Sequence, residues 1–265
     1  MLALILTFLM LPHTAEIEAW RQRRAASLTS DAGWLTVTGL FWLKEGPNRF
    51  GSDASNEIVL PATAPAHAGI FEFHSGKVLL TMDGRTHPMA SDEQVTIGPL
   101  TMFVIERGGR YAIRLRDKKS QYRRDFSGLH YFPIRESYRV TAKWVAELRK
   151  IPVTNVLGMT EPMESPGYAV FQVGGQECKL YPVIEEPDAK ELFYIFRDQT
   201  SAHETYGAGR FLYSEMPKDG SVVLDFNKAY NPPCAFTPYA TCPLPPKENR
   251  LSVRIEAGEL KYGDH

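Results

Sequence analysis

Polar and charged side chains crowd into one short stretch of the sequence, RDQTSAHETYGAGRF (197–211), between two apolar runs. Polar residues that follow apolar strands lie at the rim of a sheet, where binding residues are commonly found. Arginines here and at position 250 could bind a carboxylate or a phosphate through paired hydrogen bonds. The predicted ligand-binding residues are Arg197, Asp198, Thr200, Glu204, Tyr206, Arg210, Asp225, Asn227, Asn231 and Arg250.

The acidic members of this set allow a second interpretation. Asp198, Glu204 and Asp225 could neutralise the arginines in internal ion pairs, which would make the cluster structural. Internal ion pairs are the better explanation for any one of these residues, whereas the density of the whole cluster favours a ligand site. We therefore expect a small ligand that is acidic or polar.

Three side chains are candidates for catalysis, which would make the protein a hydrolase. Asp198 and Glu204 could act as acid or base, and His203 stands next to Glu204. Cys234 could be a nucleophile activated by His203 or His130, although a cysteine between Pro233 and Ala235 fits a small buried hydrophobe better. The sequence contains none of G-x-S-x-G, the P-loop motif, H-E-x-x-H or G-x-G-x-x-G. No cofactor is predicted.

Composition restricts the possible partners. The 265 residues include 30 basic and 31 acidic ones, with a net charge of −1, which argues against nucleic-acid binding. The densest basic stretch, RLRDKKSQYRR (114–124), also contains an acid, and we expect it to be a solvated linker. With 43% apolar residues the chain can form a substantial core.

The three cysteines do not form a disulfide framework, and free thiols are expected. Cys234 and Cys242 could pair only if the protein is exported. The C-x7-C spacing without a nearby histidine pair does not fit a structural zinc site, so no metal is predicted.

The first eleven residues, MLALILTFLML, are apolar but much shorter than the roughly 20 residues of a spanning helix, so no membrane span is expected. They resemble the apolar part of an export signal, yet no basic residue precedes them. The location stays open between the cytoplasm and export.

The predicted elements that position these residues are almost all strands. Residues 15–30 predict one amphipathic helix, with Ile17, Trp20 and Arg24 on one face. Short runs of alternating apolar residues then recur through residues 33–116, which is typical of a β-sandwich. The chain is therefore predicted to be all-β, with residues 1–32 as an apolar start and helix and a boundary near residue 117.

Part of the N-terminal sandwich resembles a forkhead-associated domain, a β-sandwich that reads phosphothreonine through its loops. Two segments carry the resemblance, NRFGSDASNEIVLPATAPAHAGIFEFHSGKVLL (48–80) and DEQVTIGPLTMFVIE (92–106). The matching residues are Gly51, Asp53, Ser55, Asn56, Ile58, Val59, Leu60, His67 and Ala68. However, Ser52 stands where the family has arginine, and Ala64 and Pro65 replace a Ser-Arg pair. These changes remove the groups that bind phosphate, so we expect a scaffold that does not bind phosphothreonine peptides.

Residues 117–265 are again rich in strands, which predicts an antiparallel, barrel-like domain. Strand-like runs include YRVTAKWVAEL, IPVTNVLG, LFYIFRDQT, RFLYSEM, SVVLDFN and RLSVRIEAG. The segment YNPPCAFTPYATCPLPPKENR (230–250) interrupts them with six prolines, which fix φ and lack an N–H. Its aromatic residues argue against disorder. We expect an ordered lid that either seals the core or forms one wall of a ligand pocket.

The stretch from FRDQTSAHETYGAGRF to RLSVRIEAGE (196–259) is similar to the signature of a bacterial and archaeal family, domain of unknown function number 1684. The resemblance extends over residues 17–262 and implies family membership without an established activity. Together, these observations favour a protein that binds a small molecule. A hydrolase that uses Asp198, Glu204 or Cys234 is one alternative, and an interaction or structural module without a small ligand is another.

Overall fold

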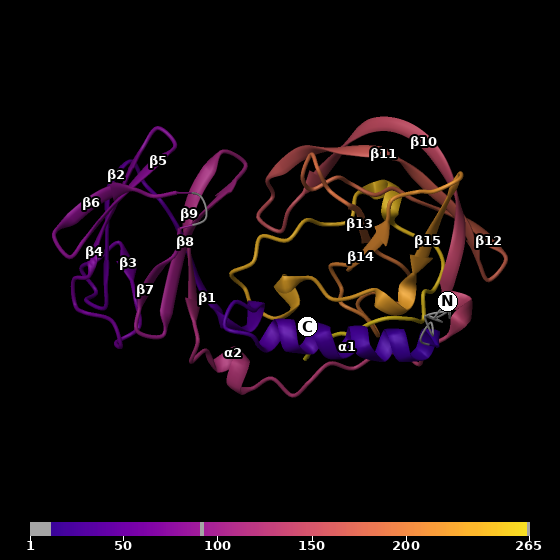
Figure 1. Cartoon of the computed structure of the whole chain (residues 1–265), viewed down its shortest axis with the longest axis horizontal. Helices are drawn as coiled ribbons and strands as arrows, with labels where there is room; N and C mark the ends of the chain where they lie inside the picture. The colour runs from indigo at the N-terminus through magenta and orange to yellow at the C-terminus, as the bar shows by residue number, and fades with distance from the viewer. Residues whose placement is uncertain (1–11, 91–92, 264–265) are drawn as a thin grey trace, which may run out of the picture.

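The computed structural model describes residues 12–90 and 93–263. The apolar run at 1–11 lies outside the described residues. The chain consists mostly of β-strands in several sheets, with one long helix near its N-terminal end. Figure 1 shows two β-rich halves side by side, with this helix lying along the C-terminal half. The predicted all-β class with a preceding helix is confirmed at this level.

Helix α1 (His13–Thr29) packs one face against the C-terminal half of the chain. Ile17 is fully buried, and Trp20 and Arg24 lie against the ring of Tyr230. These residues recur every three or four positions, the spacing that places side chains on one face of a helix. The predicted amphipathic helix is therefore confirmed. Within the described ranges, no helix is both long and apolar enough to cross a membrane.

The N-terminal half contains two sheets that share one hydrophobic core. Their strand orders are β1-β9-β8-β7 and β3-β2-β4-β5-β6. Side chains alternate between the core and the outer faces, and the rings of Phe50 and Phe71 stack 4.5 Å apart in the core. The strands are β1 (Val37–Trp42), β2 (Gly46–Gly51), β3 (Ile58–Val59), β4 (Gly69–His74), β5 (Lys77–Met82), β6 (Arg85–Pro88), β7 (Val95–Ile97), β8 (Leu100–Arg107) and β9 (Arg110–Asp117).

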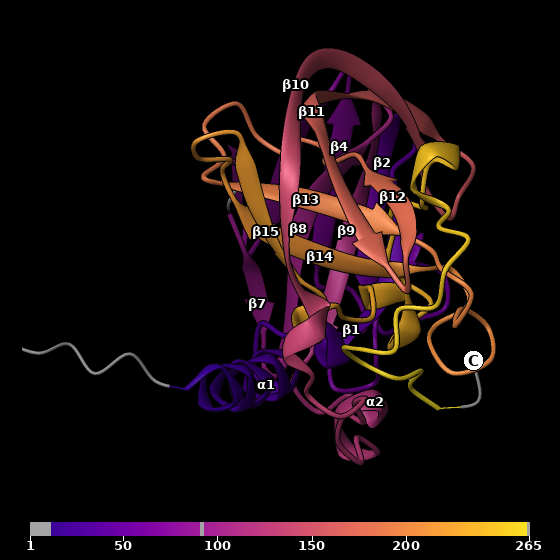
Figure 2. The same ribbon diagram turned by 90° about the vertical axis from the view of Figure 1, so that its right-hand side faces the viewer.

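The C-terminal half contains a four-stranded sheet, β12-β11-β10-β15, and a two-stranded sheet, β13-β14. The long strands β10 and β11 arch over β13 and β14 (Figures 1 and 2). The strand orders leave free edges, so neither sheet is a closed barrel. The strands are β10 (Arg139–Thr154), β11 (Thr160–Val173), β12 (Gln176–Leu180), β13 (Glu191–Phe196), β14 (Arg210–Glu215) and β15 (Ser221–Asp225), and the short helix α2 (Gln121–Arg124) precedes them.

Strand β13 is buried on both of its faces. Leu192, Tyr194 and Phe196 belong to one core cluster, and Phe193 and Ile195 belong to another. Alternate residues of a strand point in opposite directions, so a strand between two cores needs apolar residues at every position. The continuous apolar run in the sequence reflects this double burial.

Strand β10 is longer than the sequence analysis suggested. Separate strands were expected at 138–148 and 151–158, but β10 is continuous, with a register shift between Ala146 and Arg149 in its pairing with β11. Such a bulge lets a strand continue past a local interruption.

The hairpin of β8 and β9 reaches from one half of the molecule to the other. Its turn, Gly108-Gly109, has positive φ values of 57° and 71°, which L-residues with side chains rarely adopt. The N–H of Gly108 donates to Glu161 Oε1 on β11 (2.5 Å). A Cβ at Gly108 would lie 3.2 Å from Met159 Sδ, so glycine also allows the close approach.

The proline-rich segment 230–250 is ordered and contains two single-turn 3₁₀ helices, η4 (Pro233–Ala235) and η5 (Lys247–Asn249). It contacts both halves. The Thr237 hydroxyl donates to the backbone oxygen of Val37 on β1 (2.9 Å), and the N–H of Leu244 donates to the oxygen of Thr154 on β10 (2.8 Å). The segment therefore connects the two halves instead of covering only the second.

The expected strand at RLSVRIEAG (250–258) is wrong, because this segment has no regular secondary structure. Backbone bonds tie only its first part to the end of β13, for example from the N–H of Leu251 to the oxygen of Arg197 (2.7 Å). Further along, the side chains of Asp198 and Arg210 bond backbone groups of Ile255 and Ala257.

Replacement of Ile17 tests the packing of α1. Ile17→Ala should lower the free energy of unfolding by about 2–5 kcal/mol, because it leaves a cavity in a fully buried site. Gln22→Ala, on the exposed side of the same helix, is the matched control and should change stability little. Urea unfolding of the three proteins measures the difference. Equal midpoints for Ile17→Ala and the control would show that the helix does not contribute to the cooperative core.

Candidate functional site

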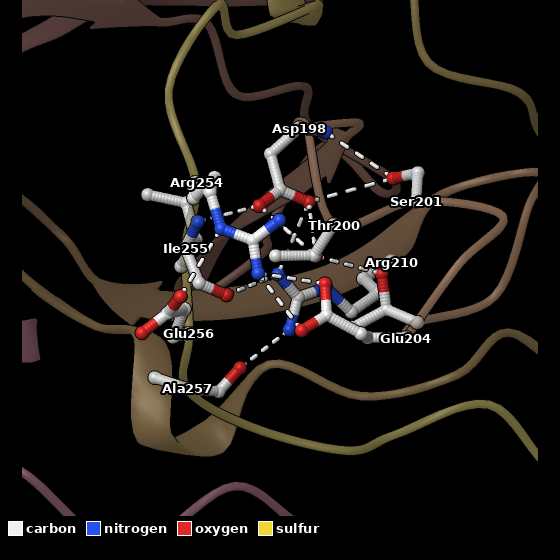
Figure 3. Close-up of polar contacts among 10 residues, drawn as sticks. Asp198, Thr200, Ser201, Glu204, Arg210, Arg254, Ile255, Glu256 and Ala257 are labelled. Carbon is white, nitrogen blue, oxygen red and sulfur yellow. Dashed lines mark hydrogen bonds and ion pairs between the residues drawn. The ribbon is translucent and has the colours of Figure 1, made fainter.

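The Asp198–Arg210 ion pair is the centre of the polar cluster that the sequence predicted (Figure 3). Asp198 follows β13 and Arg210 begins β14, so the pairing of these strands brings them together. Arg210 Nη2 lies 3.3 Å from Asp198 Oδ1, and both side chains are buried. The Arg210 guanidinium also donates to the backbone oxygens of Ile255 (3.0 Å) and Ala257.

The Asp198 carboxylate is fully engaged as well. It accepts hydrogen bonds from the hydroxyls of Thr200 (2.9 Å) and Ser201 (3.4 Å) and from the N–H of Ile255 (2.6 Å). Burial lowers the pKa of Arg210, while Asp198 opposes this shift. Such a pair is tolerated in a core only when further hydrogen bonds replace lost hydration. The pair thus holds residues 255–257 against β13 and β14.

Glu204 lies in a separate ion pair at the surface. Both of its carboxylate oxygens accept from Arg254 Nη2, at 2.8 and 2.7 Å (Figure 3). Arg254 also contacts Glu256, at 3.1 Å. Glu204 is therefore paired with an arginine that the predicted set did not include.

Asp225, Asn227 and Asn231 are buried and bonded within the protein. Asp225 Oδ2 lies 2.7 Å from His13 Nε2 of α1, and the Asn227 side chain bonds both backbone groups of Arg135. Asn231 Nδ2 donates to a backbone oxygen near the C-terminal end (2.7 Å). These side chains connect segments that are distant in sequence.

Arg197 and Arg250 differ from the rest of the set because they are exposed, with their backbones joined by a β-bridge. Tyr206 is half-buried, and burial raises its pKa to about 12. The structure therefore brings Asp198, Thr200 and Arg210 together in a buried network. It separates the exposed Arg197 and Arg250 from the buried Arg210, so the three arginines do not form one clamp.

A different part of the chain forms a cavity of about 270 Å³ beneath the proline-rich segment, which we call the inner cavity. Strands β13 and β14 contribute the aromatic side chains of Phe193, Phe211 and Tyr213. Helix α1 and strand β8 contribute Arg24 and Arg107. The proline-rich segment completes the wall between positions 230 and 243.

A larger groove of about 600 Å³, the outer groove, shares part of its wall with the inner cavity. Arg107, Glu185 and Tyr213 line both. The outer groove is predominantly acidic, since its other charged lining residues are Glu106, Glu161, Glu186, Lys190 and Glu191. The two spaces therefore differ in charge, with arginines concentrated at the inner one.

Stacked rings form the aromatic wall. The rings of Tyr213 and Tyr230 are nearly parallel, 12° apart in orientation with centroids 6.4 Å apart, and Phe193 stacks on Tyr213 at 4.8 Å. The Tyr213 hydroxyl donates to Glu185 Oε2 (2.6 Å). Burial raises the pKa of both tyrosines, so their phenols are neutral hydrogen-bonding groups near neutral pH.

Two arginines of the N-terminal sheet meet the proline-rich segment at Thr241. Arg107 Nε and Arg114 Nη2 lie 3.3 and 3.4 Å from the Thr241 hydroxyl. Arg114 is only 5% exposed and lies over the ring of Trp34. Burial, assisted by the charges of Arg107 and Arg116, lowers the pKa of Arg114 to about 10. Within the described part of the chain, Arg114 Nε has no hydrogen-bond partner and no ion pair joins Arg114 to a carboxylate.

These arginines were absent from the predicted site because residues 114–124 were expected to form a solvated linker. Residues 114–117 instead end β9, where Arg114 and Arg116 alternate with the core residues Ile113 and Leu115. The alternation was visible in YAIRLR, but only the packing of the proline-rich segment on this face buries Arg114.

Cys234, a candidate nucleophile, is half-buried beside the buried Cys242, and all three cysteines are free. Among the described residues, no group of three or more His, Cys, Asp and Glu side chains is arranged to hold a metal ion.

The Asp198–Arg210 pair can be tested by breaking it from one side. Asp198→Ala should lower the free energy of unfolding by about 3–5 kcal/mol, because Arg210 would keep a buried charge without a partner. Asp198→Ala combined with Arg210→Met should lose less stability than the single change, since no buried charge remains. Glu204→Ala, at the surface pair, is the control and should have a much smaller effect. Equal losses for Asp198→Ala and Glu204→Ala in chemical unfolding would contradict the structural role.

Comparisons with known proteins support one assignment. A family model described as "Protein of unknown function (DUF1684)" matches residues 124–260, a narrower range than the resemblance over 17–262. The solution NMR structure of an uncharacterized protein from Haloarcula marismortui is 30% identical, with 54% of this chain and 81% of that chain covered and a TM-score of 0.45. No curated protein matches the chain. Because the model matches just over half of its residues, the chain belongs to the DUF1684 family of proteins of unknown function.

Proposed function

We propose that the protein binds a small molecule in the inner cavity, with an anionic group beside Arg107 and Arg24 and a planar part against the aromatic wall. The single observation that carries this proposal is the combination of arginines and stacked tyrosines around one cavity. The ligand class remains the acidic or polar one that the sequence predicted. The residues proposed to bind it are now Arg24, Arg107, Tyr213 and Tyr230.

The size of the cavity fits this role. Ligand pockets commonly have volumes of roughly 300–1,000 Å³ and combine apolar walls with a few polar groups. The inner cavity of about 270 Å³ opens beside the outer groove of about 600 Å³ through shared lining residues. A small acid would fill the first and leave its solvated end in the second.

Arg107 is the side chain best placed to recognise an anion. It is exposed at the end of β8, lines both spaces and bonds Thr241 through Nε. A guanidinium binds carboxylate or phosphate with a fixed geometry, and Arg107 thus supplies direction as well as charge. Arg24 is more constrained, because it bonds Glu259 (3.0 Å) and lies over Tyr230.

The hydrolase alternative has less support. Asp198 is engaged by Arg210 and three hydrogen-bond donors, and Glu204 is paired with Arg254. Neither carboxylate lines the inner cavity or the outer groove. Cys234 remains as a reactive group and is considered separately below.

The two halves would then act as scaffolds that position the cavity. We infer a forkhead-associated-like sandwich at 33–116 and a barrel-like second domain at 117–265, joined by the proline-rich segment. In the first of these, the Ser52 hydroxyl donates to the backbone oxygen of Ala64 (2.9 Å) and so is occupied within the loops.

Ligand binding can be tested by thermal unfolding of the full chain with a library of aromatic carboxylates and aryl phosphates. Each compound is paired with its neutral amide or ester. A ligand present at 100 times its Kd should stabilise the protein by about 2.7 kcal/mol and raise Tm by roughly 5–10 °C. The neutral analogues should have little effect.

Variants locate the binding. Arg107→Gln should remove most of the stabilisation by anionic compounds, whereas Arg85→Gln, the same change at an exposed site on β6, should retain it. The proposal is wrong if no anionic compound stabilises the protein, if both variants respond like the parent, or if only cationic compounds bind.

The scaffold role of the N-terminal half yields a separate expectation. Phosphothreonine peptides should not bind the full chain, because the position of the family arginine is Ser52 and its hydroxyl is already bonded. Isothermal titration with phosphothreonine peptides and their unphosphorylated forms measures this. Micromolar affinity that depends on the phosphate would contradict the expectation.

A further inference from the structure

Two cysteines of the proline-rich segment lie in contact with each other. The N–H of Cys234 donates to Cys242 Sγ, at 3.1 Å. Cys242 is buried and lines the inner cavity, while Cys234 is half-buried. Seven residues separate them in sequence, so the segment must fold back to bring them together.

Arg114 supplies positive charge at this site from the other half of the molecule. It bonds the hydroxyl of Thr241, the residue before Cys242. It is 95% buried, as its exposure is 5%, and its Nε has no partner within the described residues. A buried guanidinium that lacks a carboxylate partner favours a nearby anion, and a thiolate is such an anion.

The surroundings assign different roles to the two sulfurs. The hydrogen bond from Cys242 lowers the pKa of Cys234, and the charge of Arg114 acts in the same direction. Burial is the main cause that raises the pKa of Cys242, and the hydrogen bond with Cys234 raises it further. Tyr206 also faces the pair, and its pKa of about 12 keeps it neutral. The inner cavity that Cys242 lines is bordered by further charged and titratable side chains, namely Arg24, Arg107, Glu185, Tyr213 and Tyr230. Cys234 is thus the better nucleophile, and Cys242 is the thiol that can follow.

We propose that Cys234 and Cys242 form a reversible thiol–disulfide site in which Cys234 attacks a small disulfide substrate, Cys242 resolves the product, and Arg114 positions the reactive thiolate. The proposal does not depend on the ligand of the inner cavity. It concerns a reaction that the carboxylates described above do not take part in.

The reaction balances with a low-molecular-weight disulfide, RS–SR, as oxidant. The Cys234 thiolate attacks one sulfur, which forms a Cys234–SR mixed disulfide and releases RS⁻. Cys242 then loses its proton to the first RS⁻ by way of solvent. The Cys242 thiolate attacks the Cys234 sulfur, which forms the Cys234–Cys242 bond and releases the second RS⁻. This second RS⁻ takes up the proton that Cys234 gave to solvent when it ionised. The two protein thiols lose two electrons, and RS–SR is reduced to two RSH.

Cys178 provides a control within the same chain. It is buried on β12, and burial raises its pKa. Its thiol bonds only a backbone oxygen, that of Gln176, at 3.7 Å. A disulfide substrate should therefore react at Cys234 well before Cys178.

The test incubates the reduced full chain with glutathione disulfide, quenches with acid, alkylates the unfolded protein and maps the products by mass spectrometry. We expect a Cys234–Cys242 disulfide, an alkylated Cys178, and full recovery of the thiols with dithiothreitol. Cys242→Ser should stop at a glutathione adduct on Cys234. Cys234→Ser should react at neither remaining cysteine on the same time scale.

Arg114→Gln separates a positioning role from a merely structural one. The pH profile of the first step should shift to higher pH, and its rate at pH 7 should fall roughly threefold for each unit by which the pKa of Cys234 rises. Arg110→Gln, on the same face of β9, is the matched control and should leave the profile unchanged. If Arg114→Gln unfolds, Arg114→Lys keeps the charge and should keep the parent pH profile. No disulfide, first attack at Cys178 or Cys242, or an unshifted profile in a folded Arg114→Gln protein would overturn the proposal.

Discussion

The structure depends on how residues 226–258 satisfy their backbone hydrogen bonds inside the protein. Prolines and irregular conformation keep residues 226–258 out of the sheet ladders, yet many of them are buried. A buried N–H or C=O without a partner costs free energy comparable to a lost hydrogen bond, so side chains must take the place of neighbouring strands. Arg210 and Asp198 do so for residues 255 and 257. In the other direction, the Asn249 side chain of this segment bonds the backbone of Tyr181 and Ile195.

This constraint explains why residues that resemble a binding site in sequence bond other parts of the protein in the fold. Arginine, aspartate and asparagine are common in ligand-binding sites because each side chain makes several directed hydrogen bonds. A buried backbone segment without regular secondary structure needs partners with the same property. Sequence alone cannot distinguish the two uses, because the partners of Asp198 and Asn227 lie 57 and 92 residues away. The internal ion pairs considered for these residues account for the geometry of Asp198, Arg210 and Glu204.

The pattern of apolar and polar residues predicted two kinds of strand well: strands with one buried and one exposed face, and strands buried on both faces. Two of the short alternating runs between residues 33 and 116, GIFEFH and KVLLTM, form β4 and β5, and the helix expected at 15–30 lies at His13–Thr29. The strand predicted at RLSVRIEAG is not formed, although apolar and polar residues alternate there. Alternation indicates that one side of a segment is buried, but it does not show that another strand lies beside it. The inner cavity could not be predicted from the sequence either, because its lining residues Arg24, Arg107 and Tyr213 come from three separate elements.

The proline-rich segment, which lacks strand partners, also contacts Arg107 and Arg114 and contains Cys234 and Cys242. Its Thr241 occupies the hydrogen bonds of Arg107 and Arg114 without neutralising their charge, because a hydroxyl accepts a hydrogen bond but carries no charge. Burial of Arg114 away from a carboxylate costs stability, and this charge lies near the inner cavity and the thiol pair, where we propose that anions are held. The segment therefore connects the two halves and also contacts arginine side chains whose positive charge Thr241 does not neutralise.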